Sequence, residues 1–354
     1  MPDLAPPAES SARALTRRAG VLDLHVDFIL QQRLFGYDPL RAHAAGLPGQ
    51  PLFWHCDVPR MLEAGYSGAC LGIHTWNFEY EGAWRECQRQ LAVWERLCED
   101  PRLLKVAHPG DFARARASGR LGLAIAVEGA HMLHGRLERI AELAARGVAY
   151  LTLVHLRRNR SATPGFGIGA DDTSGLTPFG REVVEELQRQ GIVVDLAHVN
   201  RAGILDAAAI SRAPLVASHA VARGRYDSAR GLHDPSVDAI AATGGLIGVM
   251  FAPQFLVGRL RADSSCVADH IEHLAARVGV AHVAIGTDFD GWIGSIPSDQ
   301  RDCRDLFRVV VELQRRGWSE PDLCALLSGN AERVFAAAWR PGSGAAPGGA
   351  GLPR

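Results

Sequence analysis

The stretch Val21-Leu22-Asp23-Leu24-His25-Val26-Asp27 decides how the rest of the chain is interpreted, because an apolar, strand-like run here carries two metal-binding side chains. Residues two apart in a β-strand point to the same face, so His25 and Asp27 project together. One imidazole nitrogen and one carboxylate oxygen suit a zinc-type ion. Because so short a motif is unspecific, a metal site is predicted only if the fold brings further ligands to the same place.

The composition is that of an ordinary globular protein. The chain has 354 residues, is 47% hydrophobic and 22% charged, and carries a formal net charge of −1. A near-neutral charge argues against nucleic-acid binding, which usually needs a basic surface. No apolar run approaches the length of a membrane span, and residues 1–20 lack the apolar core of a secretory signal. The 7 cysteines are scattered without a CxxC pair and favour reduced thiols, so we expect a cytoplasmic protein without membrane partners.

Apolar strand-like runs alternate with amphipathic helical segments along most of the chain. The eight predicted strands span residues 20–27, 69–73, 121–127, 148–154, 192–196, 214–218, 245–251 and 282–287. Most are continuously apolar, which is typical of a parallel sheet covered on both faces. Eight such α/β units most economically close into a (β/α)8 TIM barrel. The rival, an open doubly wound sheet, is not favoured because no GxGxxG turn follows the first strand.

One barrel domain, residues 19–339, is predicted between two flexible ends. Residues 1–18 are rich in Pro, Ala and Ser and predict a flexible leader, and residues 340–354 are rich in Gly and Pro and predict a disordered tail. The segment 31–59 after the first strand is too long for an ordinary βα connection. It is therefore expected to be an inserted active-site loop.

Six of the eight predicted strands end on a residue that can bind a metal or move a proton. These residues are His25 with Asp27, Glu128 with nearby His131, His155, His198, His219 and Asp288. A single histidine at a strand end is usually a packing or surface residue. Agreement among six strand ends instead favours one site at the C-terminal end of the barrel, where (β/α)8 enzymes hold their active sites.

The residue types predict a binuclear metal site. The ligands supply imidazole nitrogens and carboxylate oxygens from His25, Asp27, His198, His219 and a bridging Glu128, a set that suits two zinc-like ions. Two such ions can share a hydroxide, lower its pKa towards neutrality and polarise a carbonyl group. Asp288 is then the natural general base and acid, which takes the water proton and passes it to a leaving amine. This chemistry predicts a hydrolase of amide-like bonds.

Motifs along nearly the whole folded chain resemble the renal or membrane dipeptidases, the M19 metallopeptidases of the amidohydrolase superfamily. The resemblance rests on Asp23-x-His25-x-Asp27, Val127-Glu128-Gly129-x-His131, Leu151-Thr152-Leu153-x-His155, Asp195-Leu196-x-His198, Ser218-His219, Gly286-x-Asp288-Phe289-Asp290-Gly291 and Gly329-Asn330-x-x-Arg333-Val334-Phe335. The blocks that contain Glu128-Gly129 and Asp288-Phe289-Asp290-Gly291 are the specific part.

The resemblance implies a metallo-dipeptidase with two zinc ions. His25 and Asp27 would hold one ion, His198 and His219 the other, and Glu128 would bridge them. Members of the family cleave dipeptides, often tolerate a D-residue at the C-terminal position, and are commonly homodimers. The vertebrate disulfides and lipid-anchor signal are absent, as expected of a bacterial cytoplasmic member.

The resemblance also implies roles for residues around the metals. Asp288 would be the proton shuttle, and His155 would polarise the scissile carbonyl group and stabilise the tetrahedral intermediate. Arg230 would pair with the C-terminal carboxylate of the substrate. We expect His131 to orient a ligand or its loop, and Asp290 to support Asp288 or its turn.

Two loops depart from the family pattern, and other interpretations stay open. Residues 157–160 and 223–225 are rich in arginine, which could favour an acidic or non-dipeptide substrate or be a solvated surface. His74, after the second strand, could be a further ligand, although no role in the family corresponds to it. The site could also serve a related amidohydrolase that acts on an N-acyl amino acid, lactam or lactone. A third interpretation is a repurposed barrel that binds a peptide in a biosynthetic pathway without cleaving it.

Overall fold

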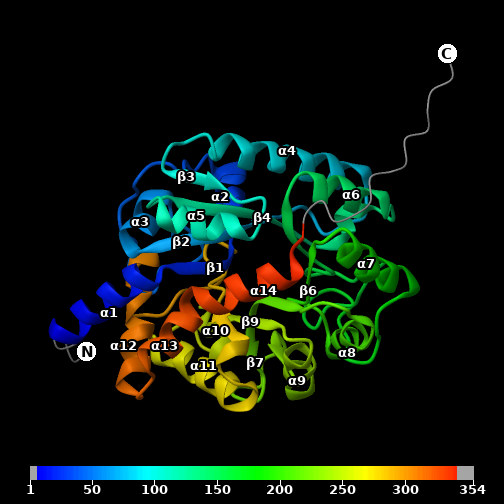
Figure 1. Cartoon of the computed structure of the whole chain (residues 1–354). Helices are drawn as coiled ribbons and strands as arrows, with labels where there is room; N and C mark the ends of the chain where they lie inside the picture. Colours follow the sequence, from blue (N-terminus) through cyan, green and yellow to red (C-terminus); the bar gives the residue numbers. More distant parts are fainter. Residues whose placement is uncertain (1–5, 341–354) are drawn as a thin grey trace.

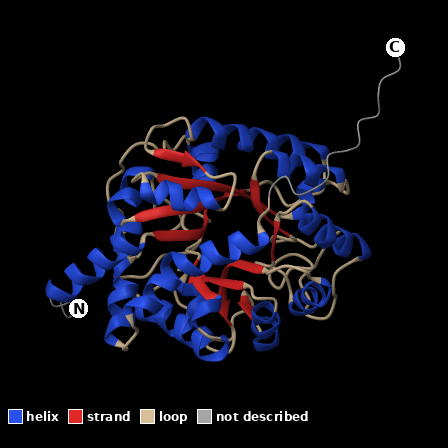
Figure 2. Cartoon of the chain, viewed as in Figure 1, coloured by secondary structure: helices blue, strands red, loops and turns tan. Residues whose placement is uncertain are grey.

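Eight strands pair in parallel and follow one another around a ring in the computed structural model, which describes residues 6–340 (Figures 1 and 2). They are β1 (Val21–Val26), β2 (Tyr66–Ile73), β4 (Leu121–Glu128), β5 (Val148–Thr152), β6 (Val193–Asp195), β7 (Val216–Ala222), β9 (Leu246–Val249) and β10 (Val283–Ile285). The ring closes where Val26 pairs in parallel with Phe289 and the Asp288 N–H donates to the His25 carbonyl at 3.1 Å. The predicted (β/α)8 barrel is therefore confirmed.

Two short strands lie beside the barrel and were not predicted. β3 (Leu103–Lys105) pairs in parallel with the start of β4, and β8 (Gly231–Leu232) pairs with the end of β7. Both contain too few residues for an alternation pattern to be recognised in the sequence.

Helices surround the strands, as the blue and red ribbons of Figure 2 show. They are α1 (Pro6–Ala19), α2 (Phe28–Phe35), α3 (Val58–Ala64), α4 (Glu81–Leu97), α5 (Gly110–Ala117), α6 (Glu138–Ala145), α7 (Pro178–Arg189), α8 (Arg201–Ile210), α9 (Asp234–Ala242), α10 (Pro253–Leu256), α11 (Ser265–Val278), α12 (Phe307–Arg315), α13 (Glu320–Cys324) and α14 (Asn330–Ala338). Several begin at a side chain that caps a free backbone N–H group: Asp57, Thr177, Asn200 and Ser319.

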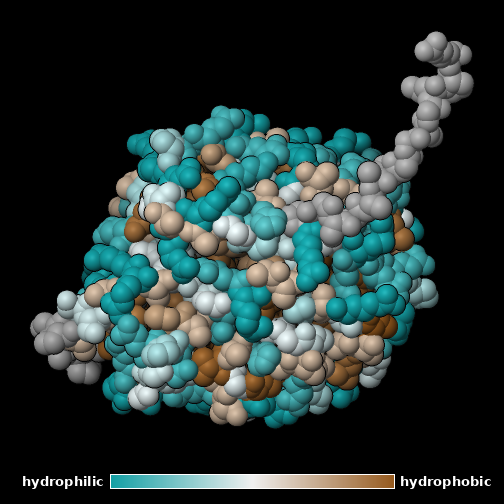
Figure 3. Space-filling view, in the orientation of Figure 1, coloured by the Kyte–Doolittle hydropathy of each residue, from teal (hydrophilic) through white to brown (hydrophobic). Residues whose placement is uncertain are grey.

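The last helix closes the barrel at the end where the strands begin. Phe335 and Trp339 pack with the first residues of β6, β7 and β9 in one buried cluster. The side chains of Asn330 and Arg333 donate to the carbonyls of Val280 and Ala281, which precede β10, at 2.7 and 2.6 Å. Figure 1 shows α14 lying across the strands, and apolar side chains are scattered among hydrophilic ones on this face (Figure 3). The opposite end of the barrel remains for a functional site.

The predicted flexible leader is wrong for residues 6–18, because they belong to helix α1. Ala12 and Leu15 of this helix are buried, and the Arg13 guanidinium lies 3.7 Å from the ring centroid of Phe307 in α12. The small apolar stripe of Ala12, Leu15 and Ala19 was hidden in a composition rich in Pro, Ala and Ser. Residues 1–5 of the leader and 341–354 of the predicted tail lie outside the described residues. Arg340, the first residue of the predicted tail, is described, and its N–H donates to the Gly191 carbonyl.

The connection from β1 to β2 contains α2, a loop over residues 36–57, and α3. It holds the long insertion that was predicted after the first strand. Within residues 6–340, no helix combines the length and apolarity that crossing a bilayer requires.

Candidate metal centre

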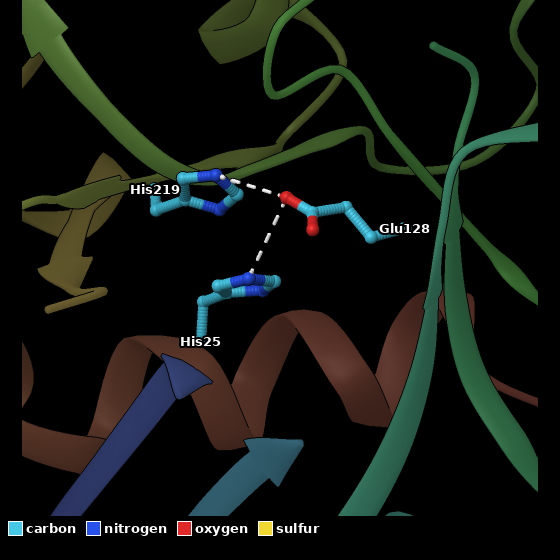
Figure 4. A group of neighbouring side chains, drawn as sticks. All are labelled: His25, Glu128 and His219. Carbon is cyan, nitrogen blue, oxygen red and sulfur yellow. Dashed lines mark ion pairs between the residues drawn. The ribbon is translucent and has the colours of Figure 1, made fainter. Parts of the chain in front are cut away.

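The predicted ligands meet at the C-terminal ends of the barrel strands. His25 lies in β1, Glu128 is the last residue of β4, and His219 lies in β7. One donor atom from each lies within 4.8 Å of the others, and all three side chains are buried. Figure 4 shows both imidazoles directed at the Glu128 carboxylate.

One oxygen of Glu128 is the centre of the site. Its Oε1 atom lies 3.0 Å from Nε2 of His198, 3.5 Å from Nε2 of His219 and 3.6 Å from Nε2 of His25. A fourth imidazole, that of His155, places its Nε2 3.7 Å from the same oxygen. Four strands thus aim histidines at a carboxylate carried by a fifth.

Two further carboxylates lie on the His25 side of this centre. The Asp27 Oδ2 atom is 3.4 Å from His25 Nε2, and Asp288 joins these two residues in a donor group within 4.8 Å. Asp27 is 3% and Asp288 8% exposed, so their charges are removed from bulk water. The predicted proton shuttle therefore lies beside the predicted ligands of the first ion.

The tautomer of His25 is fixed by Tyr150. Its Nδ1 atom lies 2.7 Å from the Tyr150 hydroxyl, which itself donates to the Leu24 carbonyl at 2.8 Å. Since the hydroxyl has only one hydrogen, His25 Nδ1–H must be the donor. In the neutral ring, Nε2 therefore carries the lone pair and is directed at Glu128, as metal coordination requires.

His219 is oriented in the same way by a chain of polar groups. Its Nδ1 lies 2.9 Å from the Ser218 hydroxyl, which donates to Asp195 Oδ2 at 2.9 Å. Thr152 donates to the same carboxylate oxygen at 2.6 Å. His219 Nδ1–H therefore donates to Ser218, and Nε2 is left with its lone pair.

Backbone geometry around the site is unusual for the residues that adopt it. His198 and Asp288 have φ angles of 66° and 61°, in the left-handed region that disfavours residues with a side chain. A Cβ on Gly72 would lie 2.2 Å from Asp27 Oδ1, and one on Gly291 would lie 2.1 Å from Asp288 Oδ1. Both glycines are required by the close approach of the carboxylates.

Protonation of the site reflects its burial. Burial raises the pKa of Glu128 to about 8 and that of Asp288 to about 7. Burial alone would lower the pKa of His25, but the neighbouring carboxylates of Asp27 and Glu128 raise it to about 10. Burial holds the pKa values of His198 and His219 well below the usual range, which leaves both as neutral imidazoles.

These residues fit divalent metal ions. Two donors of one tetrahedral zinc ion lie about 3.3 Å apart when each is about 2.05 Å from the metal. The pairs of His25 with Asp27, at 3.4 Å, and His219 with Glu128, at 3.5 Å, match this spacing. Within the described part of the chain, His25 Nε2 and Asp27 Oδ1 are buried without a hydrogen-bond partner, and a bound cation would satisfy both atoms.

His155 and His74 form the remaining wall of the site. His155 Nδ1 lies 2.9 Å from Asn77 Oδ1, and the ring of His74 meets that of His155 edge-on with centroids 4.9 Å apart. His74, Glu128 and His155 form a third donor group within 4.8 Å, and His74 Nδ1 is buried without a hydrogen-bond partner among residues 6–340. His74 follows a strand end like the other candidate ligands, so its position in the sequence carries the same signal.

Arg230 is buried beside the centre without a carboxylate partner. It is 6% exposed, and its Nη2 donates to the His219 carbonyl at 3.0 Å. Within residues 6–340 no Asp or Glu oxygen lies within 4.0 Å of its guanidinium. A buried guanidinium needs an anion, so this position suits an anionic ligand.

His131 and Asp290 lie behind the site. His131 Nε2 is 2.9 Å from the Thr75 hydroxyl, which places it against the loop after β2. Asp290 accepts the backbone N–H of His55 at 2.8 Å and the thiol of Cys56 at 3.4 Å. Asp290 thus joins the turn after β10 to the long loop after β1.

The arginine-rich loops carry little unpaired charge. Four of their arginines form ion pairs: Arg158 with Asp171, Arg160 with Glu79, Arg223 with Asp227, and Arg225 with Asp269. Arg157 lies over the ring of Phe78, 4.7 Å from its centroid. The geometry therefore favours an ordinary solvated surface over recognition of an acidic substrate.

Comparison with known proteins places these observations in a family context. The family model "Membrane dipeptidase (Peptidase family M19)" matches residues 9–341. Dipeptidase 3 of Macaca fascicularis is 30% identical over 312 residues, which cover 79% of this chain and 63% of the relative, so the match spans less than two thirds of that protein.

Solved structures agree with this match. A metallopeptidase described as the dipeptidase AC of family M19 is 28% identical with a TM-score of 0.79, over 90% of this chain and 98% of the other. A metallopeptidase from Rhodobacter sphaeroides, liganded with a phosphinate mimic of the dipeptide L-Ala-D-Ala, is 26% identical with a TM-score of 0.78, over 90% and 99%.

Proposed function

Since the chain belongs to the membrane dipeptidases of peptidase family M19, we propose that it is a metallo-dipeptidase with two zinc ions. The observation that carries the proposal is the arrangement of three imidazole Nε2 atoms within 3.6 Å of one Glu128 oxygen. A carboxylate so placed can bridge two ions. His25 and Asp27 would complete one set of ligands, and His198 and His219 the other.

When bound, the ions would lower the pKa of water and polarise the carbonyl group of the scissile amide. The protein residues fix where this chemistry occurs. Tyr150 and Ser218 hold the imidazoles of His25 and His219 with Nε2 directed at Glu128. The ligands therefore need no reorganisation when metal binds, which supports a preformed catalytic centre.

Arg230 would bind the C-terminal carboxylate of the substrate. Its guanidinium is buried, lacks a carboxylate partner and lies beside His219, so a substrate anchored there extends over the ligands. A planar guanidinium can hold a carboxylate with two parallel hydrogen bonds. This pairing would fix the position of the scissile amide as well as that of the charged group.

His155 would donate a hydrogen bond to the scissile carbonyl oxygen. This role requires a proton on Nε2, while Nδ1 contacts Asn77 at 2.9 Å. The neutral ring carries that proton when the Asn77 amide is turned so that its NH2 group donates to Nδ1. Asn77 would then set the tautomer that the reaction needs.

Asp288 would take a proton from the attacking water and deliver it to the leaving amine. It lies beside Asp27 and His25, on the turn that follows β10. A carboxylate at this place lies within reach of the reacting atoms, as a general base must. The L-Ala-D-Ala mimic bound by the Rhodobacter relative supports inclusion of D-residues at the C-terminal position.

The test is a substrate panel on metal-free and zinc-loaded protein. L-Ala-L-Ala, L-Ala-D-Ala and N-acetyl-L-Ala are compared after removal of metal with a chelator and after addition of zinc. We expect zinc-dependent hydrolysis of the two dipeptides and none of the N-acetyl compound. Preferred hydrolysis of N-acetyl-L-Ala would favour the related amidohydrolase, whereas no zinc binding and no hydrolysis would favour a repurposed barrel.

A further inference from the structure

Three large aromatic side chains lie exposed on the segments after β1 and β10, at the end of α2 and in the two loops. Phe35 is 55%, Trp54 50% and Trp292 52% exposed. They are not isolated, because Phe53 touches each of them, with ring centroids 4.9 Å from Phe35, 6.5 Å from Trp54 and 5.5 Å from Trp292. We call these four residues the aromatic platform. A contiguous exposed apolar surface of this kind marks an interaction site.

The platform is held by hydrogen bonds between the two loops that carry it. The Leu52 N–H donates to the Ile293 carbonyl at 3.0 Å. The His55 N–H donates to Asp290 Oδ1 at 2.8 Å, and the Asp290 N–H donates to His55 Nδ1 at 3.0 Å. His55 and Asp290 are fully buried, so the two loops form one fixed support.

Backbone strain indicates that exposure of these rings is not incidental. Trp54 and Trp292 have φ angles of 68° and 61°, in the left-handed region that large side chains disfavour. Burial of their rings does not offset this strain, because both rings are half exposed. Strain retained without such compensation is characteristic of functional positions.

The platform lies at the edge of the metal centre. Trp292 follows Gly291, where an added Cβ would lie 2.8 Å from Asp27 Oδ2 and 2.1 Å from Asp288 Oδ1. Trp54 precedes His55, whose N–H donates a hydrogen bond to Asp290, a residue of the turn that also holds Asp288 and Gly291. Both tryptophans are therefore carried by segments that adjoin the turn of Asp288 and Asp290.

The strand order separates the platform from Arg230 along the rim of the barrel. In the ring, β7 lies opposite β2, and β10 and β1 are two and three positions from β7. Arg230 follows β7, whereas the platform follows β1 and β10. A dipeptide whose carboxylate is held by Arg230 and which extends over the metal centre directs its N-terminal residue towards the ends of β1 and β2, and the platform borders this region through the segment after β1.

We propose that the aromatic platform binds the side chain of the substrate's N-terminal residue and makes the enzyme prefer dipeptides with a bulky apolar residue at that position. The proposal rests on the dipeptidase function proposed above. Apolar and aromatic side chains are recognised by burial against such rings, and a few methylene groups change kcat/KM by about 10-fold or more.

The experiment compares kcat/KM for L-Phe-L-Ala and L-Leu-L-Ala with that for L-Ala-L-Ala in the zinc-loaded full chain. We expect about a 10-fold preference for the larger residues. Trp54→Ala and Trp292→Ala should each reduce this ratio several-fold, whereas Trp292→Phe, which retains an aromatic ring, should keep most of it. Leu205→Ala, an exposed apolar position on α8, is the matched control and should leave the ratio unchanged.

Three outcomes would overturn the proposal. The first is equal kcat/KM for all three dipeptides in the wild type. The second is a ratio that survives both alanine substitutions. The third is a platform variant that light scattering shows to have changed from dimer to monomer while its ratio of kcat/KM values stays unchanged. The rings would then form a subunit interface. Failure of zinc-loaded protein to cleave any dipeptide would instead reject the proposed function itself.

Discussion

Tyr150→Phe should weaken metal binding although Tyr150 is not a ligand. The hydroxyl accepts the Nδ1–H of His25 at 2.7 Å, and both residues are fully buried. Without it, the neutral imidazole is no longer held in the Nδ1–H tautomer and can keep its single hydrogen on Nε2, where it donates to the carboxylates of Asp27 and Glu128. The metal must then compete with that proton for the Nε2 lone pair.

The magnitude follows from the lost hydrogen bond. A buried donor left unsatisfied costs about 1–3 kcal/mol. A difference of 1.4 kcal/mol corresponds to a factor of 10 in an equilibrium constant. We therefore expect the zinc affinity of the position that His25 and Asp27 would form to fall by about 10- to 100-fold, the range found for residues that orient metal-binding histidines.

The assay is competition for zinc with a chromophoric chelator at fixed pH. Tyr66→Phe is the matched control, because Tyr66 is also buried on a barrel strand but its hydroxyl has no hydrogen-bond partner within residues 6–340. We expect Tyr66→Phe to bind zinc like the wild type. Wild-type affinity in Tyr150→Phe, or an equal loss in Tyr66→Phe, would refute the role assigned to the Tyr150 hydroxyl.

Three further substitutions test other parts of the site. Asp288→Asn should lower kcat by about 10²- to 10⁴-fold, the usual contribution of a general base, while the zinc content measured by mass spectrometry stays unchanged. An unchanged rate would reject the proton shuttle. The control is Asp238→Asn on the outer surface. Arg230→Lys should raise the KM for dipeptides by about 10-fold, because one charge-assisted hydrogen bond of about 1.5–3 kcal/mol is lost; steady-state kinetics with a C-terminally amidated dipeptide should show no such difference between variant and wild type. Asp290→Asn should stabilise the protein more at pH 8 than at pH 5. Burial raises the folded-state pKa of Asp290 from 3.8 to about 7, so the native state binds more protons than the unfolded state between these two pH values. The stability of the wild type therefore falls as the pH rises from about 4 to about 7, and the neutral Asn side chain avoids this loss. Denaturant midpoints of both proteins at the two pH values measure this, and a pH-independent difference would contradict it.

The barrel could be predicted because its strands are nearly continuous apolar runs separated by amphipathic segments. The grouping of the candidate ligands could be predicted because parallel strands place all their C-terminal ends on one edge, so a residue's position in its run also gives its position in space. His74 has the same signal, but no residue of the family pattern corresponds to it. Helix α1 was missed because its buried stripe consists mainly of alanine, which contributes little to a hydrophobic pattern.

The supporting contacts could not be predicted, because they join residues that are far apart in the sequence. Tyr150 is 125 residues from His25, and Asn77 is 78 residues from His155. No local spacing encodes such pairs. The aromatic platform is similar: Phe53 and Trp54 lie in the long predicted loop, but the contact of Phe53 with Trp292 depends on how two loops meet.

Barrel closure and ligand placement depend on the same hydrogen bonds. Asp23 in β1 accepts the Thr287 N–H at 2.9 Å and hydroxyl at 2.7 Å, so it joins β1 to the end of β10. Asp195 in β6 accepts the Ser218 N–H from β7 at 2.8 Å and the Thr152 hydroxyl from β5.

Each of these aspartates lies two or three residues before a histidine of the centre. The bonds that fix the strands relative to one another therefore also fix His25 and His198, and the metal ligands need no support from the long loops. Those loops are consequently not needed to hold the candidate ligands, and in this chain they carry the aromatic platform. The proposed metal centre and the proposed substrate preference would therefore depend on different parts of the chain.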